Sequence, residues 1–204
     1  MNIDERTNKP KIILHLCAKY GSDTIPYKEA GYDVRIIGEE IGVQNYTPPE
    51  NVYGIIANPP CTMFSIARSK AKTPRDLREG MYLVKECLRI IWECQYNIKE
   101  NQRSSNLKFW CIENPATGML KLFLGNPTFQ YCHSQYGEPH TKQTAMWGLF
   151  NLPIKPLLSN PLPKQSSLCG DKIKISDYKD SDERMQLRSM VPKLFTELFF
   201  DANQ

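Results

Sequence analysis

A short apolar run that stops at two consecutive prolines constrains this chain more than any other stretch. Residues 52–57, Val-Tyr-Gly-Ile-Ile-Ala, have the length and composition of a buried strand. Neither Pro59 nor Pro60 has an N–H group for a strand hydrogen bond, so the chain has to leave the sheet there. Cys61 then follows the carboxyl end of the strand, where open α/β sheets bind ligands. It is a candidate nucleophile, and a buried structural thiol is the alternative.

Strands and helices alternate along the first half of the chain. Strand-like runs cover residues 11–17 and 33–38, and Asp23 or Thr24 is placed to cap a short helix between them. Apolar side chains recur at helical spacing through residues 76–99. This order predicts an α/β fold in which helices flank a mostly parallel sheet.

The second half predicts three more strands and a closing helix. The strands are expected at residues 107–112, 128–132 and 144–148, and the helix at residues 183–202. Residues 151–180 are rich in Pro, Ser and Lys and are expected to be irregular.

The composition is that of an ordinary globular protein. With 204 residues, 41% hydrophobic and 24% charged, the chain predicts one domain over residues 1–204, with residues 1–10 flexible. The polar start has no signal-peptide core and no apolar run reaches membrane-span length, which favours a cytoplasmic protein without membrane contact. Seven cysteines without a CxxC pair indicate reduced thiols and no metal site. The net charge of +4 fits a polyanionic partner without requiring one.

A carboxylate follows a second strand in the same way as Cys61 follows the first. Glu113 comes directly after residues 107–112. If the two strands are parallel neighbours, Cys61 and Glu113 lie at the same edge of the sheet. A thiolate and a carboxylic acid together suit attack on a pyrimidine ring: the thiolate adds to carbon 6 while the acid stabilises charge on the ring nitrogen. Carbon 5 then becomes nucleophilic and accepts a one-carbon group.

Four short segments stand out for their residue types and their order along the chain. The first two are Pro59-Pro60-Cys61 with Phe64-Ser65, and Ile112-Glu113-Asn114-Pro115. They resemble the catalytic loop and the Glu-Asn-Val motif of the cytosine-5 DNA methyltransferases, in the style of small phage and prophage members, and the other two follow in the same order as in that family. The run from Tyr136 to Thr144 resembles Tyr-Gly-x-Pro-Gln-x-Arg-x-Arg. Met190-Val191-Pro192 resembles the segment that closes the cofactor pocket. Together the four are a more specific signal than any one alone.

The resemblance implies a reduced Rossmann-like class I methyltransferase fold, S-adenosylmethionine as cofactor and DNA as partner. It makes Cys61 the nucleophile and Glu113 the acid, and gives Lys142 the role of positioning the Cys61 loop or the target phosphate. The implied cofactor-binding residues are Cys17, Gly21, Ser22, Glu39, Glu40, Asn58, Pro59 and Pro192. The implied substrate-binding residues are Pro60, Ser65, Arg68, Asn114, His140 and Thr144.

The chain departs from the family pattern in three places. Its glycine-rich cofactor loop is reduced to residues 16–22, which keep only Gly21. Lys142 and Thr144 stand where the family has arginines. The stretch after residue 148 is too short for a target-recognition domain, so sequence preference is expected to be low or supplied by a partner. The basic residues 68–75 are candidates for phosphate contacts, or else form a solvated loop.

Two other functions remain open. One is the same carbon-5 chemistry on a nucleotide or RNA, with S-adenosylmethionine or another one-carbon donor. The other is a catalytically degenerate protein that binds nucleic acid or a host factor, although such a protein has no chemical need for both Cys61 and Glu113.

Overall fold

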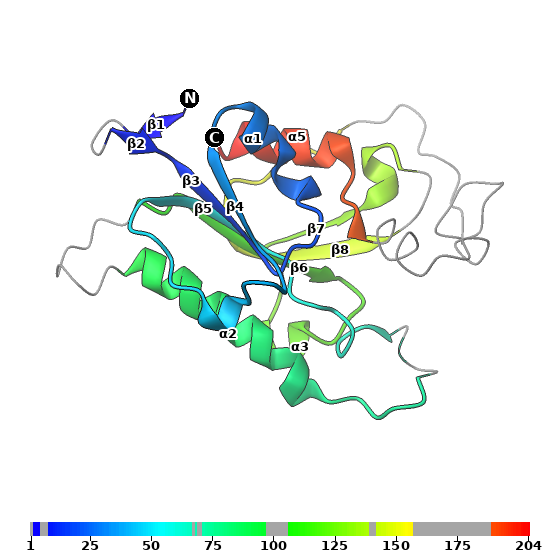
Figure 1. Ribbon diagram of the computed structural model, residues 1–204. Helices are drawn as coiled ribbons and strands as arrows, with labels where there is room; N and C mark the ends of the chain where they lie inside the picture. The colour runs from blue at the N-terminus through cyan, green and yellow to red at the C-terminus, as the bar shows by residue number, and fades with distance from the viewer. Residues whose placement is uncertain are drawn as a thin grey trace.

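A six-stranded mixed sheet forms the centre of the protein (Figure 1). The computed structural model describes residues 2–4, 8–66, 68, 71–96, 106–138, 142–156 and 189–204. The strand order is β4-β3-β5-β6-β8-β7. The strands are β3 (Ile12–Leu16), β4 (Asp33–Ile37), β5 (Val52–Ala57), β6 (Phe109–Pro115), β7 (Phe129–Cys132) and β8 (Gln143–Leu149). A separate antiparallel pair, β1 (Ile3–Asp4) and β2 (Lys9–Pro10), precedes the sheet.

Five of the six strands run in the same direction, and β8 alone runs in the opposite direction. β3 pairs in parallel with both β4 and β5, and β5 pairs in parallel with β6. The prediction of a mostly parallel sheet flanked by helices is therefore confirmed. β8 runs antiparallel to both β6 and β7. β4 lies on one side of β3 and β5 lies on the other, so the strand order reverses between β3 and β5. In sheets of this kind, ligands usually bind in a crevice at the carboxyl ends of the two strands where the order reverses.

Helices cover both faces of the sheet (Figure 1). Figure 1 shows α1 (Ile25–Glu29) and α5 (Lys193–Ala202) over one face, and α2 (Leu77–Gln95) and α3 (Lys121–Leu124) over the other. Alternate residues of each strand supply two separate cores. Leu14, Ile55 and Ile112 pack with the α2 face, whereas Ile13, Ile56 and Cys111 pack with the face under α1 and α5. Among the described residues, no helix has the length and apolarity needed to cross a bilayer.

The predicted long helix is present as α2. It begins where Asp76 accepts hydrogen bonds from the backbone N–H groups of Arg78 and Glu79, which satisfies two donors of the first turn. It ends at Gln95, and residues 97–105 lie outside the described part of the chain.

The short helix after β3 forms with Thr24 at its N-cap, one of the two expected positions, but without a side-chain capping hydrogen bond. A 3₁₀ turn, η1 (Ser22–Thr24), precedes α1, and neither Asp23 nor Thr24 caps a helix through its side chain. Both side chains bind elsewhere: the carboxylate of Asp23 accepts from Asn58, and the hydroxyl of Thr24 donates to the Gly21 carbonyl. The turn brings these side chains to the carboxyl edge of the sheet.

Two boundaries differ from the prediction. The strand expected at residues 107–112 continues to Pro115, because the antiparallel partner β8 extends pairing beyond the end of β5. Glu113 therefore lies within β6, opposite Met146, instead of following the strand. The closing helix, expected from residue 183, is described from Lys193. Residues 157–188, which hold most of the segment expected to be irregular, lie outside the described part.

Candidate active site

The loop that carries Cys61 leaves β5 at Asn58 and turns sharply. The Cys61 carbonyl accepts hydrogen bonds from the N–H groups of Phe64 (2.9 Å) and Ser65 (2.7 Å). The fully buried Phe64 ring anchors the turn in the core on the α2 face. Pro59 is buried and Pro60 is exposed, so Cys61 lies half-buried at the carboxyl edge of the sheet. This is the position that the sequence predicted for it.

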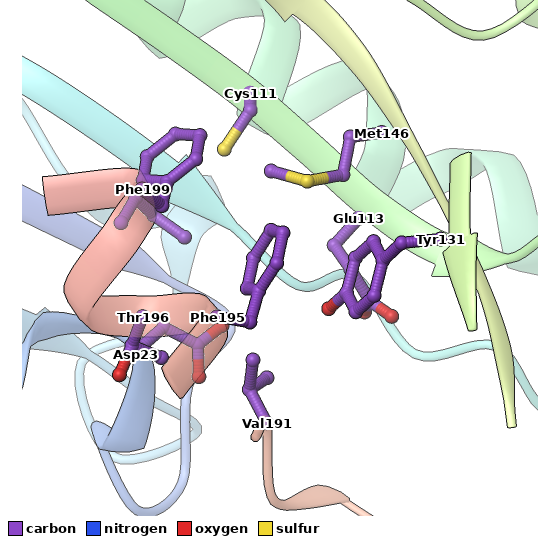
Figure 2. Close-up of a pocket in the computed structure, with 10 residues that line it drawn as sticks. Asp23, Cys111, Glu113, Tyr131, Met146, Val191, Phe195, Thr196 and Phe199 are labelled. Atoms are coloured by element: carbon purple, nitrogen blue, oxygen red, sulfur yellow. The ribbon is translucent and has the colours of Figure 1, made fainter. Parts of the chain in front are cut away.

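Glu113 enters the same edge from the neighbouring strand. Because Ala57 pairs with Ile112, Glu113 follows one residue beyond the last pair of β5 and β6. Its side chain helps to line a small cavity, about 20 Å³, with Asp23, Tyr131 and Phe195 (Figure 2). Figure 2 shows the Phe195 ring in the middle of this group. Phe195 stacks on Tyr131 with ring centroids 3.9 Å apart. The cavity is too small for a nucleobase.

The Glu113 carboxyl is poised to hold a proton. Its Oε1 atom is buried and has no hydrogen-bond partner among the described residues, and the Lys142 Nζ atom lies 3.8 Å from it. Burial raises the pKa of Glu113, and the nearby Asp23 carboxylate raises it further. Lys142 and hydrogen bonds from Thr144 and Asn58 act in the opposite direction without cancelling the effect of burial. The carboxyl therefore stays protonated to a higher pH than an exposed glutamate.

Asn58 connects Glu113 to two further polar side chains. Its Nδ2 atom donates to Asp23 Oδ2 at 2.9 Å, and its Oδ1 atom lies 3.0 Å from His15 Nε2. The other ring nitrogen of His15 lies 3.4 Å from the hydroxyl of Thr24. His15 is almost fully buried in β3. Asn58 was expected to bind a cofactor, and the structure places it at the centre of this protein-internal network.

Lys142 and Thr144 lie on the other side of Glu113. Thr144 was expected to bind the substrate, but its side chain is fully buried. It lies beside Glu113, and hydrogen bonding from it lowers the pKa of that carboxyl. Its hydroxyl also lies 3.2 Å from Nε2 of the buried His133. Asn114 points to the opposite face and donates to the Pro59 carbonyl at 2.9 Å. His140, the remaining substrate candidate of this segment, lies outside the described residues.

The predicted cofactor residues of β3, β4 and β5 meet at one edge. Leu16 pairs with both Ile37 and Ala57, which puts Cys17, Gly38 and Asn58 side by side at the carboxyl ends. A Cβ atom on Gly38 would lie 2.9 Å from the Ala18 carbonyl oxygen, so only glycine fits beneath this loop. Glu39 and Glu40 follow as exposed carboxylates that suit ribose hydroxyl groups. The residues present therefore fit a nucleoside-containing cofactor.

The other predicted cofactor residues have roles within the protein's own structure. Gly21 has a positive φ of 69°, and Ser22 donates to Asp23. Cys17, with a φ of 57°, lies with its sulfur 3.7 Å from that of Cys87, and this hydrogen bond lowers the pKa of Cys17. Pro192 occupies the N-cap of α5, next to Val191 at the cavity.

The arginines of the basic segment bind the protein itself. Arg75 donates to the carbonyls of Met63 and Ser65, which closes the loop around Cys61. Arg68 donates to the Thr73 hydroxyl at 2.6 Å and to the Pro74 carbonyl at 3.1 Å. Lys72 is exposed. Among the described phosphate-contact candidates, Lys72 is therefore more exposed to solvent than Arg68 or Arg75. The two arginines stabilise the conformation of the segment through their hydrogen bonds.

Sequence reasoning missed five residues that build this site. His15 and Asp23 complete the Asn58 network, His133 adjoins Thr144, and Tyr131 and Phe195 form the aromatic side of the cavity. His15 and His133 did carry a signal, because each is a polar residue beside or within a strand that is otherwise apolar on that face. The pairing of β3 with β5 and of β6 with β8 determines which of these polar residues meet.

The fold and the site define an α/β protein with a thiol loop and a buried acid at the carboxyl edge of a mostly parallel sheet. No protein-family model matches the chain, and no curated protein matches it either. In the described part of the chain, no group of three or more His, Cys, Asp or Glu side chains is arranged to hold a metal ion.

Proposed function

We propose that the protein is a cytosine carbon-5 methyltransferase that acts on DNA with S-adenosylmethionine as donor. The observation that carries the proposal is that the Cys61 loop and the buried Glu113 carboxyl lie at the same edge of the sheet, at the ends of two adjacent parallel strands. The strand order also supports a reduced Rossmann-like methyltransferase fold, since the order reverses at the edge where the candidate cofactor residues gather.

In this mechanism the two residues act on one ring. The Cys61 thiolate forms a bond to carbon 6, and Glu113 delivers its proton to the ring nitrogen N3, so the electron pair of the carbon 5–carbon 6 double bond becomes available at carbon 5. S-adenosylmethionine, when bound, supplies the methyl group. A water or a nearby base then takes the carbon-5 proton, the carbon 5–carbon 6 double bond re-forms as the Cys61 thiolate leaves, and N3 returns its proton to Glu113. Lys142, close to Glu113, helps to orient the acid.

Trapping the enzyme on modified DNA tests the proposal. DNA containing 5-fluorocytosine lacks the carbon-5 proton, so wild-type protein with S-adenosylmethionine should remain covalently attached, and Cys61→Ser should not. Cys94→Ser is the matched control, because Cys94 is also half-buried but lies near the C-terminal end of α2. No covalent product with the wild type on any DNA, or full activity in Cys61→Ser, would contradict the proposed function.

The same chemistry on a nucleotide or RNA is the second candidate. It is favoured by the shortness of the connection between β8 and α5, residues 150–192. A DNA-reading domain would have to lie there, and the connection is too short to form one. A methyl-transfer assay on DNA, RNA and free deoxycytidine nucleotides separates the two. Low, sequence-independent activity on DNA supports the first candidate, with any strong preference supplied by a partner protein. Methylation of the monomer alone supports the second.

A further inference from the structure

One amide group joins the two acids of the site. Asn58 donates from Nδ2 to Asp23, and Glu113 lines the same cavity as Asp23. The Asn58 side chain also acts on Glu113, because hydrogen bonding from it lowers the pKa of that carboxyl. An amide nitrogen has two hydrogens, so Asn58 can serve both carboxyl groups at once. Glu113 Oε1 is itself buried, has no hydrogen-bond partner among the described residues and lies 3.8 Å from Lys142 Nζ.

His15 fixes which way this amide points. A carboxylate only accepts hydrogen bonds, so the Asn58 atom that faces Asp23 must be the nitrogen. The Asn58 oxygen therefore faces His15, and the His15 Nε2 atom, 3.0 Å away, must carry a hydrogen. Asp23 Oδ2 lies 3.9 Å from the same ring nitrogen. Rotation of the amide would break the bonds to His15 and Asp23 together.

We propose that His15, Asn58 and Asp23 are positioning residues for Glu113: the Asn58 amide, oriented by His15, holds the Asp23 carboxylate at the cavity that Asp23 and Glu113 line together, and this arrangement fixes the surroundings of the Glu113 carboxyl. This inference rests on the proposed role of Glu113 as the acid. Asp23 and Asn58 act on the Glu113 proton in opposite directions, since a neighbouring negative charge disfavours ionisation and a donated hydrogen bond favours it.

Other groups also face Glu113, and the test has to keep them constant. Lys142 approaches from the residue before β8, and the fully buried Thr144 lies between Glu113 and His133. Tyr131 of β7 and Cys111 of β6 line the same cavity. Among its described residues, α5 contributes to this cavity only Phe195, Thr196 and Phe199, none of which is ionisable. None of these groups is altered in the variants below.

The experiment follows the Glu113 carboxyl by NMR in protein labelled with carbon-13 at glutamate carboxyl groups. Glu113→Gln identifies the signal, and the pH titration is measured without substrate or cofactor. Asp23→Asn keeps an acceptor for Asn58 but removes the charge, so the titration midpoint should fall below that of the wild type. Asn58→Leu keeps the size but removes the donor, so the midpoint should rise. His15→Leu should resemble Asn58→Leu, and His15→Gln, which keeps a donor at similar reach, should restore the wild-type midpoint.

Opposite shifts in Asp23→Asn and Asn58→Leu support the network, because a general loosening of the fold would move both the same way. An unchanged midpoint in Asp23→Asn overturns the proposal even if the leucine variants fail to fold, since asparagine is nearly isosteric with aspartate. Shifts of the same sign also overturn it. Trapping on 5-fluorocytosine DNA is scored separately: opposite shifts without trapping refute the proposed reaction but not the network, and trapping without the shifts refutes the network alone.

Discussion

Asn114 donates a hydrogen bond from its buried side-chain amide to the main-chain carbonyl of Pro59, 2.9 Å away. The two residues belong to adjacent strand ends, the one that carries Glu113 and the one that leads to Cys61. Pro59 cannot hold this position through an N–H group of its own, so the carbonyl contact ties the start of the Cys61 loop to β6. The bond therefore links the loop that carries Cys61 to the strand that carries Glu113.

Asn114→Ala should therefore loosen the Cys61 loop. Removal of the donor leaves the Pro59 carbonyl without this partner and should cost about 1–3 kcal/mol of unfolding free energy, measured by urea denaturation. Trapping on 5-fluorocytosine DNA should also slow. Asn51→Ala is the matched control, because Asn51 makes the same kind of bond to the Pro10 carbonyl at 3.0 Å, far from the site. Equal trapping by both variants would show that the bond has no role in the reaction.

Glu113→Gln should change the pH dependence of stability. The pKa of Glu113 is raised in the folded protein above its ordinary value of 4.5, so the folded state holds this proton where the unfolded state has lost it. Over that range the folded state binds more protons, and its stability falls as pH rises. Glutamine does not ionise. The melting temperature of Glu113→Gln relative to wild type should therefore rise with pH from about 4.5 and level off above the folded-state pKa. A difference that stays flat from acid to neutral pH contradicts the raised pKa.

Lys72→Gln and Arg75→Gln should separate phosphate binding from loop structure. Both remove one positive charge, but Lys72 is exposed, whereas Arg75 donates to the carbonyls of Met63 and Ser65. Lys72→Gln should lower the slope of log affinity for DNA against log salt by about 1 and leave turnover of bound DNA unchanged. Arg75→Gln should reduce turnover because the Cys61 loop loses two hydrogen bonds. Filter binding over a range of salt and single-turnover trapping measure the two effects, and identical behaviour of the variants would refute the assignment.

Gly148→Ala should disrupt the pairing of β6 with β8. A Cβ atom at Gly148, which has a φ of 147°, would lie 2.1 Å from the Trp110 carbonyl oxygen, and backbone cannot move aside there without breaking the strand pair. We expect a loss of about 3 kcal/mol or more, since overpacking adds to backbone strain. Gly137→Ala is the control: its φ is also positive, at 87°, but no atom lies within 4 Å of the added carbon. It should cost only about 1–2 kcal/mol. Equal thermal destabilisation of the two variants would contradict the clash.

Much of the architecture is readable from local sequence. The apolar run before Asn58, the double proline and the helical spacing after Asp76 each act through neighbouring residues, and β5 and α2 form where these signals predict. The placement of Cys61 after β5 is equally local, because a proline without an N–H group ends a strand whatever surrounds it. Asp23 shows the limit of such reasoning: its position suits a helix cap, but its carboxylate binds Asn58.

The amino-acid sequence by itself determined the strands, the main helix and the placement of Cys61 and Glu113 near the carboxyl ends of two strands. Tertiary structure decided which polar groups share a site. The antiparallel pairing of β8 extends β6 past Glu113, buries Thr144 beside it and brings His133 within reach. Asp23, 35 positions from Asn58, becomes its hydrogen-bond partner only because β3 and β5 are neighbours. Strand order and register arise from long-range burial of two separate cores, and no local pattern encodes them.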